Sequence, residues 1–557
     1  MAFPSKRGKH PQSQSSEVAL SPEEPMTQDG AETAARWRGW LVLSALLAPA
    51  IVAVWASAAF VTQDGPAHLY NAQILVESSH ANSPFAGIYA VRWSPLPNWL
   101  GHLMQMGLVA TLPPLAADRV STTLPLIGLA ASTFWLKRRV SGRRGDLNAA
   151  LFAVVAALNV CWLFGFTSFL LGACLFPLTL GVWWAGRDTF GPGRAAALAG
   201  LVVVGYFAHV VSLGLTVVGL GILLIATPGP RRSRTAWTTA AMTPLLVLLP
   251  LYRGQMRKGG PIEPVWGQWR DLRSLDCWRE QLGWVDPISL GRKGALPFLP
   301  WDSPWLGIAT PAAVFLAAIV ALLVRQRRFR AVHRGWALLA GILIFGGYVT
   351  PDTLGPAHGN YLPQRVVLLG LVSLAACIDF DASRRTGKIA LGLLAAAFAI
   401  QTLTVFDYAR ESSQRAAPFA RARTEIGRGL RIGTLLIDTG GRFRANPLLH
   451  ADALLGVGTG NVVWSNYETR YYYFPVQFRE DLDRPSSETF EVIARMTDPK
   501  DAARRLRLWS ALLDRHHSEL DVLVLWGRNS ELEAESARWF DRRPLVEEGR
   551  LRAWRHR

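Results

Sequence analysis

Long apolar runs separated by short basic clusters fill most of the chain between residues 37 and 406, and this pattern most limits the possible folds. A run of about 20 apolar residues is long enough to cross the hydrocarbon core of a bilayer as a helix. Hydrophobic residues make up 50% of the 557 residues, too many for a soluble protein of ordinary composition. The sequence therefore predicts a polytopic, α-helical integral membrane protein.

The apolar runs predict about eleven transmembrane helices. Two of the runs, 195–208 and 210–226, are short for full spans, so they form either one crossing or two. The expected crossings are 37–60, 115–136, 147–163, 168–185, 195–208, 210–226, 235–252, 304–324, 335–349, 361–378 and 388–406.

Basic clusters between the runs set the expected orientation, because cytoplasmic loops carry an excess of Lys and Arg. With these clusters inside, the N-terminus is expected in the cytoplasm and the tail after about Asp407 outside it, in a bacterial cytoplasmic (inner) membrane. This pattern accounts for the net charge of +18 better than nucleic-acid binding does. The clusters are Arg36 with Arg38, KRRVSGRR at 137–144, RRSR at 231–234, RQRRFRAVHR at 325–334 and SRRTGK at 383–388.

Three outer loops are expected, 61–114, 253–303 and about 350–363. In the first, the apolar run 98–112 is separated from the next crossing only by Pro113-Pro114. If both runs crossed, the basic cluster that follows would lie outside, against the charge rule. We therefore expect 98–112 to lie along the outer interface, with a Pro-broken pair of crossings as the alternative. The second loop mixes Trp with charged residues, as expected of a segment that covers a site at the interface.

The two ends of the chain are polar. Residues 1–35 are rich in Ser and Pro, which predicts a disordered cytoplasmic tail. Residues 407–557 contain two strand-like runs, GTLLID at 433–438 and LDVLVLW at 520–526, and predict a small extracytoplasmic α/β domain. No Gly-rich phosphate loop, C-x-x-C or H-E-x-x-H motif occurs in a usable context, and four cysteines are too few for a disulfide framework.

Asp64 and His68 are the leading catalytic candidates. They lie directly after the first apolar run, in FVTQDGPAHLYN, where ionisable side chains are costly and usually functional. Asp64 precedes Gly65-Pro66 and a helical pattern, so we expect it to cap a helix whose N-terminus keeps the carboxylate ionised. His68 follows on the same face. The pair can accept a proton from a hydroxyl or amine, or Asp64 can help to hold a divalent cation such as Mg²⁺ or Mn²⁺. The alternative is a plain cap beside a surface histidine.

Other polar residues lie near the expected outer ends of the helices. Arg365, at the start of a late apolar run, could bind a phosphate through two parallel hydrogen bonds, or could simply extend to the interface. Arg92 in YAVRWSPLPNW, and His358 and Tyr361 in HGNYLPQR, are weaker candidates for substrate binding. His209, between two short runs, is expected either to line a cavity or to serve packing.

The layout and several short motifs resemble the GT-C superfamily of membrane glycosyltransferases, which includes protein O-mannosyltransferases and aminoarabinose transferases. SPLPNWL at 94–100, followed by LPP at 112–114 and ADR at 117–119, is similar to that family's proline-led interfacial helix and the start of its second crossing. HGNYLPQR and, in the tail, SNYETRYYYFPVQF look like segments of bacterial members. The resemblance implies a GT-C-like transmembrane domain over residues 36–406.

In that family the acidic residue after the first helix is catalytic, so the resemblance implies this role for Asp64. Many members have two adjacent acids there, whereas the neighbours of Asp64 are Gln63 and Gly65. The resemblance also implies a polyprenyl-phosphate sugar donor, held at its phosphate by basic residues of which Arg365 is the best match. The acceptor would be a lipid, a glycan or a protein.

Two other functions fit a polytopic membrane protein of this kind. In a transporter or flippase, Asp64 and His68 would gate the pathway or couple it to protons. The sequence shows no repeated half with matching broken helices, which disfavours this function. A non-catalytic envelope-assembly protein would instead use its outer domain to bind a partner.

Overall fold

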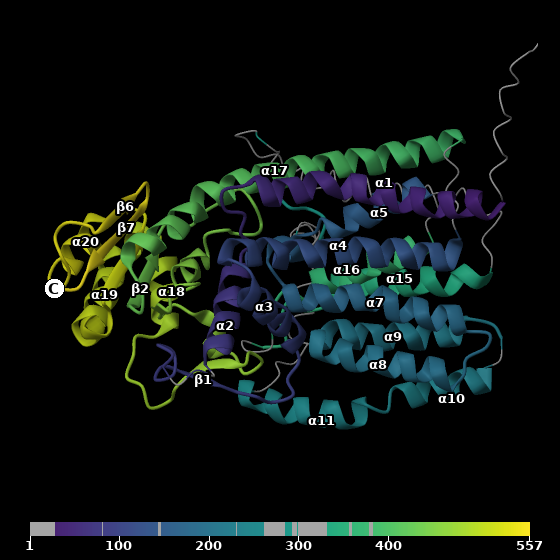
Figure 1. The fold of residues 1–557 in the computed structure, drawn as a ribbon, viewed down its shortest axis with the longest axis horizontal. Helices are drawn as coiled ribbons and strands as arrows, with labels where there is room; N and C mark the ends of the chain where they lie inside the picture. The colour runs from purple at the N-terminus through teal and green to yellow at the C-terminus, as the bar shows by residue number, and fades with distance from the viewer. Residues whose placement is uncertain are drawn as a thin grey trace, which may run out of the picture.

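The computed structural model describes residues 28–78, 80, 82–142, 146–229, 231–260, 284–291, 298, 331–355, 359–377 and 383–557. Within them, a bundle of roughly parallel helices fills one end of the molecule and a domain that contains strands fills the other (Figure 1). Four of the predicted features lie outside the described residues: residues 1–27 of the tail, most of the loop at 253–303, the crossing at 304–324, and His358.

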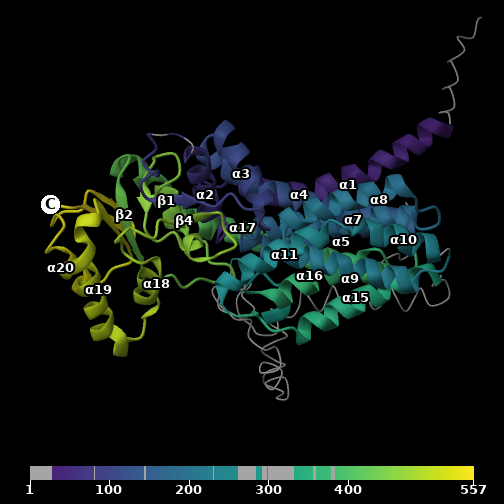
Figure 2. The same cartoon turned by 90° about the horizontal axis from the view of Figure 1, so that it is seen from below.

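Long helices form the bundle and pack side by side in both views (Figures 1 and 2). Large apolar side chains such as Trp162, Trp183 and Leu369 are fully buried between them and form its core. The helices are α1 (Gln28–Ala56), α4 (Pro114–Ser141), α5 (Asp146–Ala157), α6 (Val160–Leu163), α7 (Thr167–Gly186), α8 (Pro192–Ala208), α9 (Val210–Ala226), α10 (Arg231–Ala241), α11 (Leu245–Met256), α15 (Ala331–Val349), α16 (Leu362–Ala375) and α17 (Arg385–Ile426), with a short 3₁₀ turn, η1 (Arg257–Gly259).

Three described helices are long and apolar enough to cross a membrane: Trp37–Ala56 within α1, α7 and α17. A fourth span would form if α10 and α11, which are bent by 43° at their junction, cross together. Helices α5, α8, α9 and α16 are apolar but shorter than a usual span. The run from 195 to 226 is divided between α8 and α9, which meet at His209. About eleven crossings remain a prediction.

Helix α17 connects the bundle to the C-terminal domain. It has 42 residues, lies beside α1 and then extends to the strands at the other end (Figure 1). The helix continues beyond the apolar run because residues 407–426 are polar but still helix-forming. It ends before Gly427, whose φ of 114° is a conformation that only glycine adopts readily. The predicted boundary at Asp407 therefore falls inside a helix.

The C-terminal domain is built on a five-stranded mixed sheet in the order β3-β2-β5-β7-β6. The two predicted strands are present as β2 and β5, which pair in parallel with Ile432 opposite Val522. The strands are β2 (Arg431–Leu436), β3 (Val462–Val463), β5 (Val522–Trp526), β6 (Val546–Glu548) and β7 (Leu551–Arg555); the helices are α18 (Ser487–Arg495), α19 (Ala502–His516) and α20 (Ser530–Ser536), and the 3₁₀ turns are η4 (Ala451–Leu455), η5 (Tyr467–Arg470), η6 (Pro499–Asp501) and η7 (His517–Glu519).

The first predicted outer loop is folded into the C-terminal domain. It contains α2 (Gly65–Glu77), β1 (Tyr89–Val91) and α3 (Trp99–Thr111), and β1 pairs antiparallel with β4 (Val476–Phe478). The helix predicted over 98–112 is present as α3. Tyr70 and Phe85 of this loop share one buried core with Trp464 and the sheet. The loop and the C-terminal domain therefore form a single packed unit at one end of the bundle.

Candidate active site

A cavity lies between this packed unit and the adjacent end of the bundle. Its volume is about 180 Å³, and it is open to solvent on one side. The predicted residues Asp64, His68, His209, Tyr361 and Arg365 all line it. Asp64 and Arg365, which are 301 positions apart in the sequence, therefore line the same cavity.

Arg92 has a different position. It is not among the residues that line the cavity. Its guanidinium donates to the carbonyl of Tyr472 over 3.4 Å and to Oε1 of Gln477 over 3.2 Å. Arg92 therefore holds a segment of the C-terminal domain that forms part of the cavity wall.

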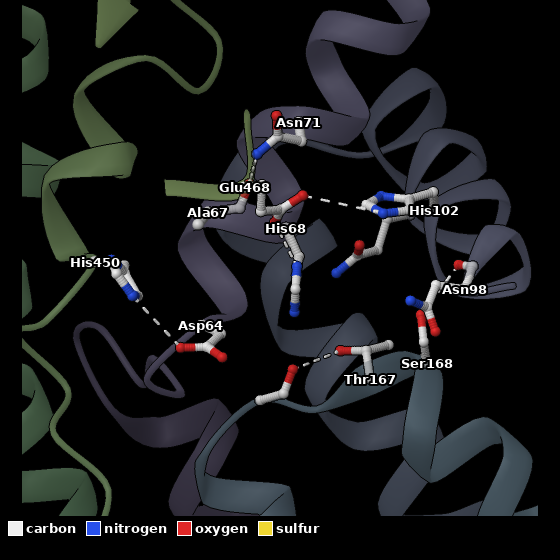
Figure 3. Close-up of polar contacts among 12 residues, drawn as sticks. Asp64, Ala67, His68, Asn71, Asn98, His102, Thr167, Ser168, His450 and Glu468 are labelled. Atoms are coloured by element: carbon white, nitrogen blue, oxygen red, sulfur yellow. Dashed lines mark hydrogen bonds and ion pairs between the residues drawn. The ribbon is translucent and has the colours of Figure 1, made fainter. Parts of the chain in front are cut away.

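Asp64 stands at the first turn of α2, held by its backbone. The amides of Gln63 and Asp64 donate to the carbonyls of Leu163 and Phe164, over 2.9 and 3.0 Å. Asp64 is the N-cap residue, as predicted, but its side chain makes no capping hydrogen bond. The carboxylate instead faces the cavity, with Nε2 of His450 3.7 Å from Oδ1 (Figure 3).

We expected the N-terminus of α2 to stabilise the ionised carboxylate of Asp64. In the structure the net effect of the surroundings is the opposite, because they favour the protonated form. Burial raises the pKa of Asp64 to about 6, and the nearby His68 and a hydrogen bond from Gln63 only partly oppose this. Burial also lowers the pKa of His450 to about 3, so this histidine is neutral and gives Asp64 no counter-charge. At neutral pH Asp64 is mostly ionised and is a stronger base than a solvated aspartate.

His68 does not contact Asp64 through its side chain but binds a carboxylate from the C-terminal domain. Its Nδ1 lies 2.5 Å from Oε1 of Glu468, a fully buried residue in η5. The second oxygen of Glu468 is 4.0 Å from Nε2 of His102 in α3. Glu468 therefore lies between two histidines, and the other ring nitrogen of His68 points toward the space beside Asp64 and Thr167 (Figure 3).

Arg365, from α16 of the bundle, also lines the cavity and packs against the rings of Phe166 and Phe169, at 4.5 and 5.3 Å from their centroids. Its Nη1 is 3.2 Å from Nε2 of His209. Because Nδ1 of His209 accepts from the amide of Val211, the ring proton of a neutral His209 lies on Nε2. Two N–H groups then face each other, and the buried Nε of Arg365 has no hydrogen-bond partner among the described residues.

The C-terminal domain supplies an aromatic wall. Its cavity-lining residues are Tyr467, Tyr471, Tyr472, Tyr473 and Phe474, all from the segment SNYETRYYYFPVQF. The ring of Tyr467 stacks on that of His450 at 4.1 Å, and the rings of Tyr471 and Tyr473 stack at 5.3 Å. Aromatic faces of this kind bind the apolar faces of organic ligands while the hydroxyls form hydrogen bonds.

The described residues do not form a divalent-cation site. Within the described ranges, no group of three or more His, Cys, Asp and Glu residues has a metal-binding arrangement. The polar side chains next to the carboxylate of Asp64 are those of Gln63, His450 and Tyr467, none of which is a second carboxylate. Among the described residues, Asp64 therefore lacks the partners that a divalent cation would need.

Glu468 and His102 were missed by sequence reasoning. Glu468 is 400 residues from His68, so no local pattern could pair them. The only signal was the tyrosine-rich segment that contains Glu468, which stood out in the tail but carried no assigned role. His102 lies in an apolar helix, where a lone histidine is usually a packed core residue.

No protein-family model matches this sequence, and a search of curated proteins finds no match. Among solved structures, the chain is similar to ArnT from Cupriavidus metallidurans in the apo state, with a TM-score of 0.50, 11% identity, and coverage of 94% of this chain and 98% of ArnT. The structure of the same protein bound to undecaprenyl phosphate matches with a TM-score of 0.50, 13% identity and the same coverage.

The chain also matches the mycobacterial arabinofuranosyltransferase AftD, with a TM-score of 0.41 and 16% identity; the match covers 94% of this chain and 40% of AftD. The similarity to ArnT spans almost the full length of both chains and includes the bundle and the C-terminal domain. The protein therefore has the fold of ArnT over almost its whole length.

Proposed function

We propose that this protein is a membrane glycosyltransferase that moves a sugar from a polyprenyl-phosphate donor to an acceptor outside the cytoplasm. The observation that carries the proposal is that one cavity is lined both by a partly buried arginine, whose buried Nε has no hydrogen-bond partner among the described residues, and by an aspartate with a raised pKa. A glycosyl transfer from a phosphate needs both: one group for the leaving phosphate and one for the proton of the acceptor.

Arg365 would bind the phosphate. A guanidinium that is partly withdrawn from water and has no carboxylate partner is costly unless an anion binds to it. The Nε of Arg365 has no partner in the described part of the chain, and the N–H of His209 points at its Nη1. A phosphate bound beside both side chains would accept a hydrogen bond from each of them. The structure of ArnT with undecaprenyl phosphate supports a lipid phosphate as the ligand of this fold.

Asp64 would act as the general base. As the acceptor oxygen or nitrogen forms a bond to the anomeric carbon, its proton moves to the carboxylate of Asp64. The bond between the anomeric carbon and the phosphate oxygen breaks, and its electron pair stays on the polyprenyl phosphate. The charge that develops on this phosphate is where the fixed cation Arg365 lowers the barrier most.

The proposed side of the membrane follows from the charge rule. With Arg36 and Arg38 in the cytoplasm, α1 would deliver Asp64 to the outer face, and the cavity and the C-terminal domain would lie there too.

The lipid content of a strain that lacks the protein tests this proposal. We expect a polyprenyl-phosphate sugar to accumulate because it is no longer consumed, and wild-type protein to restore its normal level. The Asp64→Asn variant should fail to do so although it is present in the membrane at the wild-type amount. The Arg194→Gln variant, which loses an exposed arginine that binds Thr189, should complement fully. Normal lipid levels with Asp64→Asn would contradict the role of Asp64, and an unchanged lipid profile in the deletion strain would contradict the donor class.

A further inference from the structure

Glu468 is a fully buried carboxylate that the C-terminal domain brings to the edge of the cavity. Its Oε1 is 2.5 Å from Nδ1 of His68, and its Oε2 has no hydrogen-bond partner in the described ranges, with Nε2 of His102 at 4.0 Å. In the proposed transfer reaction Glu468 has no role, and the protonation state of His68 is not specified. A role for this buried carboxylate therefore has to be sought in its contact with His68.

A buried carboxylate needs a counter-charge close by. The titratable groups that face His68 are Asp64, Glu468, His102 and His450. Burial lowers the pKa of His102 to about 4 and that of His450 to about 3, so neither is charged at neutral pH. Arg470, two residues from Glu468, binds Glu491 at 2.7 Å instead. His68 is the group left to balance Glu468.

The position of Glu468 is fixed independently of its charge. Asn466, two residues earlier, and Asn71, at the next turn of α2 after His68, exchange two amide hydrogen bonds of 3.0 and 2.9 Å. The hydroxyl of Tyr70 donates to the carbonyl of Asn461 over 2.8 Å. These buried contacts join α2 to the segment before η5. The packing of the two segments therefore sets the distance between His68 and Glu468.

We propose that Glu468 is a positioning residue that holds His68 as an imidazolium beside Asp64, so that the C-terminal domain completes the active site. This inference rests on the function proposed above. Glu468 accepts the Nδ1 proton, which directs the Nε2–H of His68 into the cavity (Figure 3). The positive ring then stabilises the ionised form of Asp64, which burial otherwise disfavours. Glu468 itself raises the pKa of Asp64, but less than His68 lowers it. Without the charge of Glu468, His68 becomes neutral, and the loss of its positive charge outweighs the loss of the more weakly coupled negative one, so Asp64 takes up a proton more easily.

The protonation of single histidines tests the proposal without any substrate. Exchange of the ring C2 hydrogen for deuterium, followed by mass spectrometry of the full-length protein in detergent, gives a titration curve for the peptide that contains His68. We expect a midpoint above the ordinary histidine value of about 6.5 in the wild type. In Glu468→Gln, which keeps the size and an acceptor oxygen, the midpoint should fall by about one pH unit or more.

The matched control is Glu533→Gln, which removes a carboxylate that binds Arg552 elsewhere in the same domain and should leave the His68 titration unchanged. A wild-type midpoint at or below the ordinary value overturns the proposal even if Glu468→Gln fails to fold. So does an equal midpoint in the wild type and a folded Glu468→Gln variant.

The rate of glycosyl transfer, measured as a function of pH, distinguishes a failure of this proposal from a failure of the proposed function. In Glu468→Gln the acidic limb of the rate profile should move to higher pH, because Asp64 loses a neighbouring positive charge, and Glu468→Asp should recover part of the shift. If no transfer occurs in the wild type, the proposed function fails while the histidine titration still decides whether Glu468 charges His68. If transfer occurs with an unshifted limb, Glu468 has no part in it.

Discussion

At the scale of single residues, Asp64 combines two properties that oppose each other. The cavity desolvates its carboxylate, which raises the pKa to about 6 and makes it a better base. The same desolvation makes the ionised form unfavourable in the folded protein. Because the pKa is higher in the folded state than the ordinary 3.8, this cost is absent below about pH 4, grows between pH 4 and 6, and is complete above that.

Removing the charge of Asp64 should therefore stabilise the protein while it abolishes activity. We expect Asp64→Asn to raise the free energy of unfolding at pH 7 by about 1 to 3 kcal/mol, since one pKa unit corresponds to about 1.4 kcal/mol. Thermal unfolding of the purified protein in detergent measures this. The melting temperature of Asp64→Asn should exceed that of the wild type at pH 7, and the difference should disappear toward pH 4. A lower melting temperature for Asp64→Asn at pH 7 would show that the charged form is stabilised in the fold.

At the scale of elements, the contact between α2 and the segment before η5 decides where Glu468 lies. The amides of Asn71 and Asn466 exchange two hydrogen bonds inside the protein, and truncating one side chain removes both of these bonds from the other. Asn71→Ala should lower the free energy of unfolding by about 1 to 3 kcal/mol and reduce transfer by about tenfold or more at saturating donor. We expect the lower transfer rate because loss of this contact would displace Glu468 and His68 from their positions at the cavity.

Asn529→Ala provides the matched control for this contact. Asn529 caps α20 by accepting from the amide of Leu532, far from the cavity, and its loss should cost about 1 kcal/mol without a change in transfer by the folded protein. Thermal unfolding and transfer are measured on both variants. Full transfer by Asn71→Ala, together with a clear loss of stability, would contradict a role for this contact in the site.

The elements themselves were largely predictable, since each depends on a local pattern. The apolar run 98–112 appears as α3, and the strand-like runs at 433–438 and 520–526 appear as the paired β2 and β5. Hydropathy failed at Asp407, because it marks where a helix stops being apolar and not where the helix ends. The stop signal was Gly427, after about twenty more helical residues that continue α17 into the second domain.

At the scale of the whole molecule, the site belongs to no single domain. The bundle contributes Arg365 and His209, the outer loop contributes Asp64 and His68, and the C-terminal domain contributes Glu468 and a wall of tyrosines. Sequence reasoning singled out residues at helix ends because ionisable side chains there are rare, and several of these residues line the cavity. It could not find Glu468, because its role depends on the packing of the outer loop against a domain that comes nearly 400 residues later.

The central claim, that this cavity binds a polyprenyl phosphate through Arg365, is tested most directly by binding of undecaprenyl phosphate to the purified protein. Native mass spectrometry of the wild type, Arg365→Gln and Arg194→Gln counts the bound lipid at increasing concentration. We expect equal binding by the wild type and Arg194→Gln, and at least tenfold weaker binding by Arg365→Gln, because a lost charged hydrogen bond to phosphate costs about 1.5 kcal/mol or more. Equal binding by all three proteins would contradict the claim.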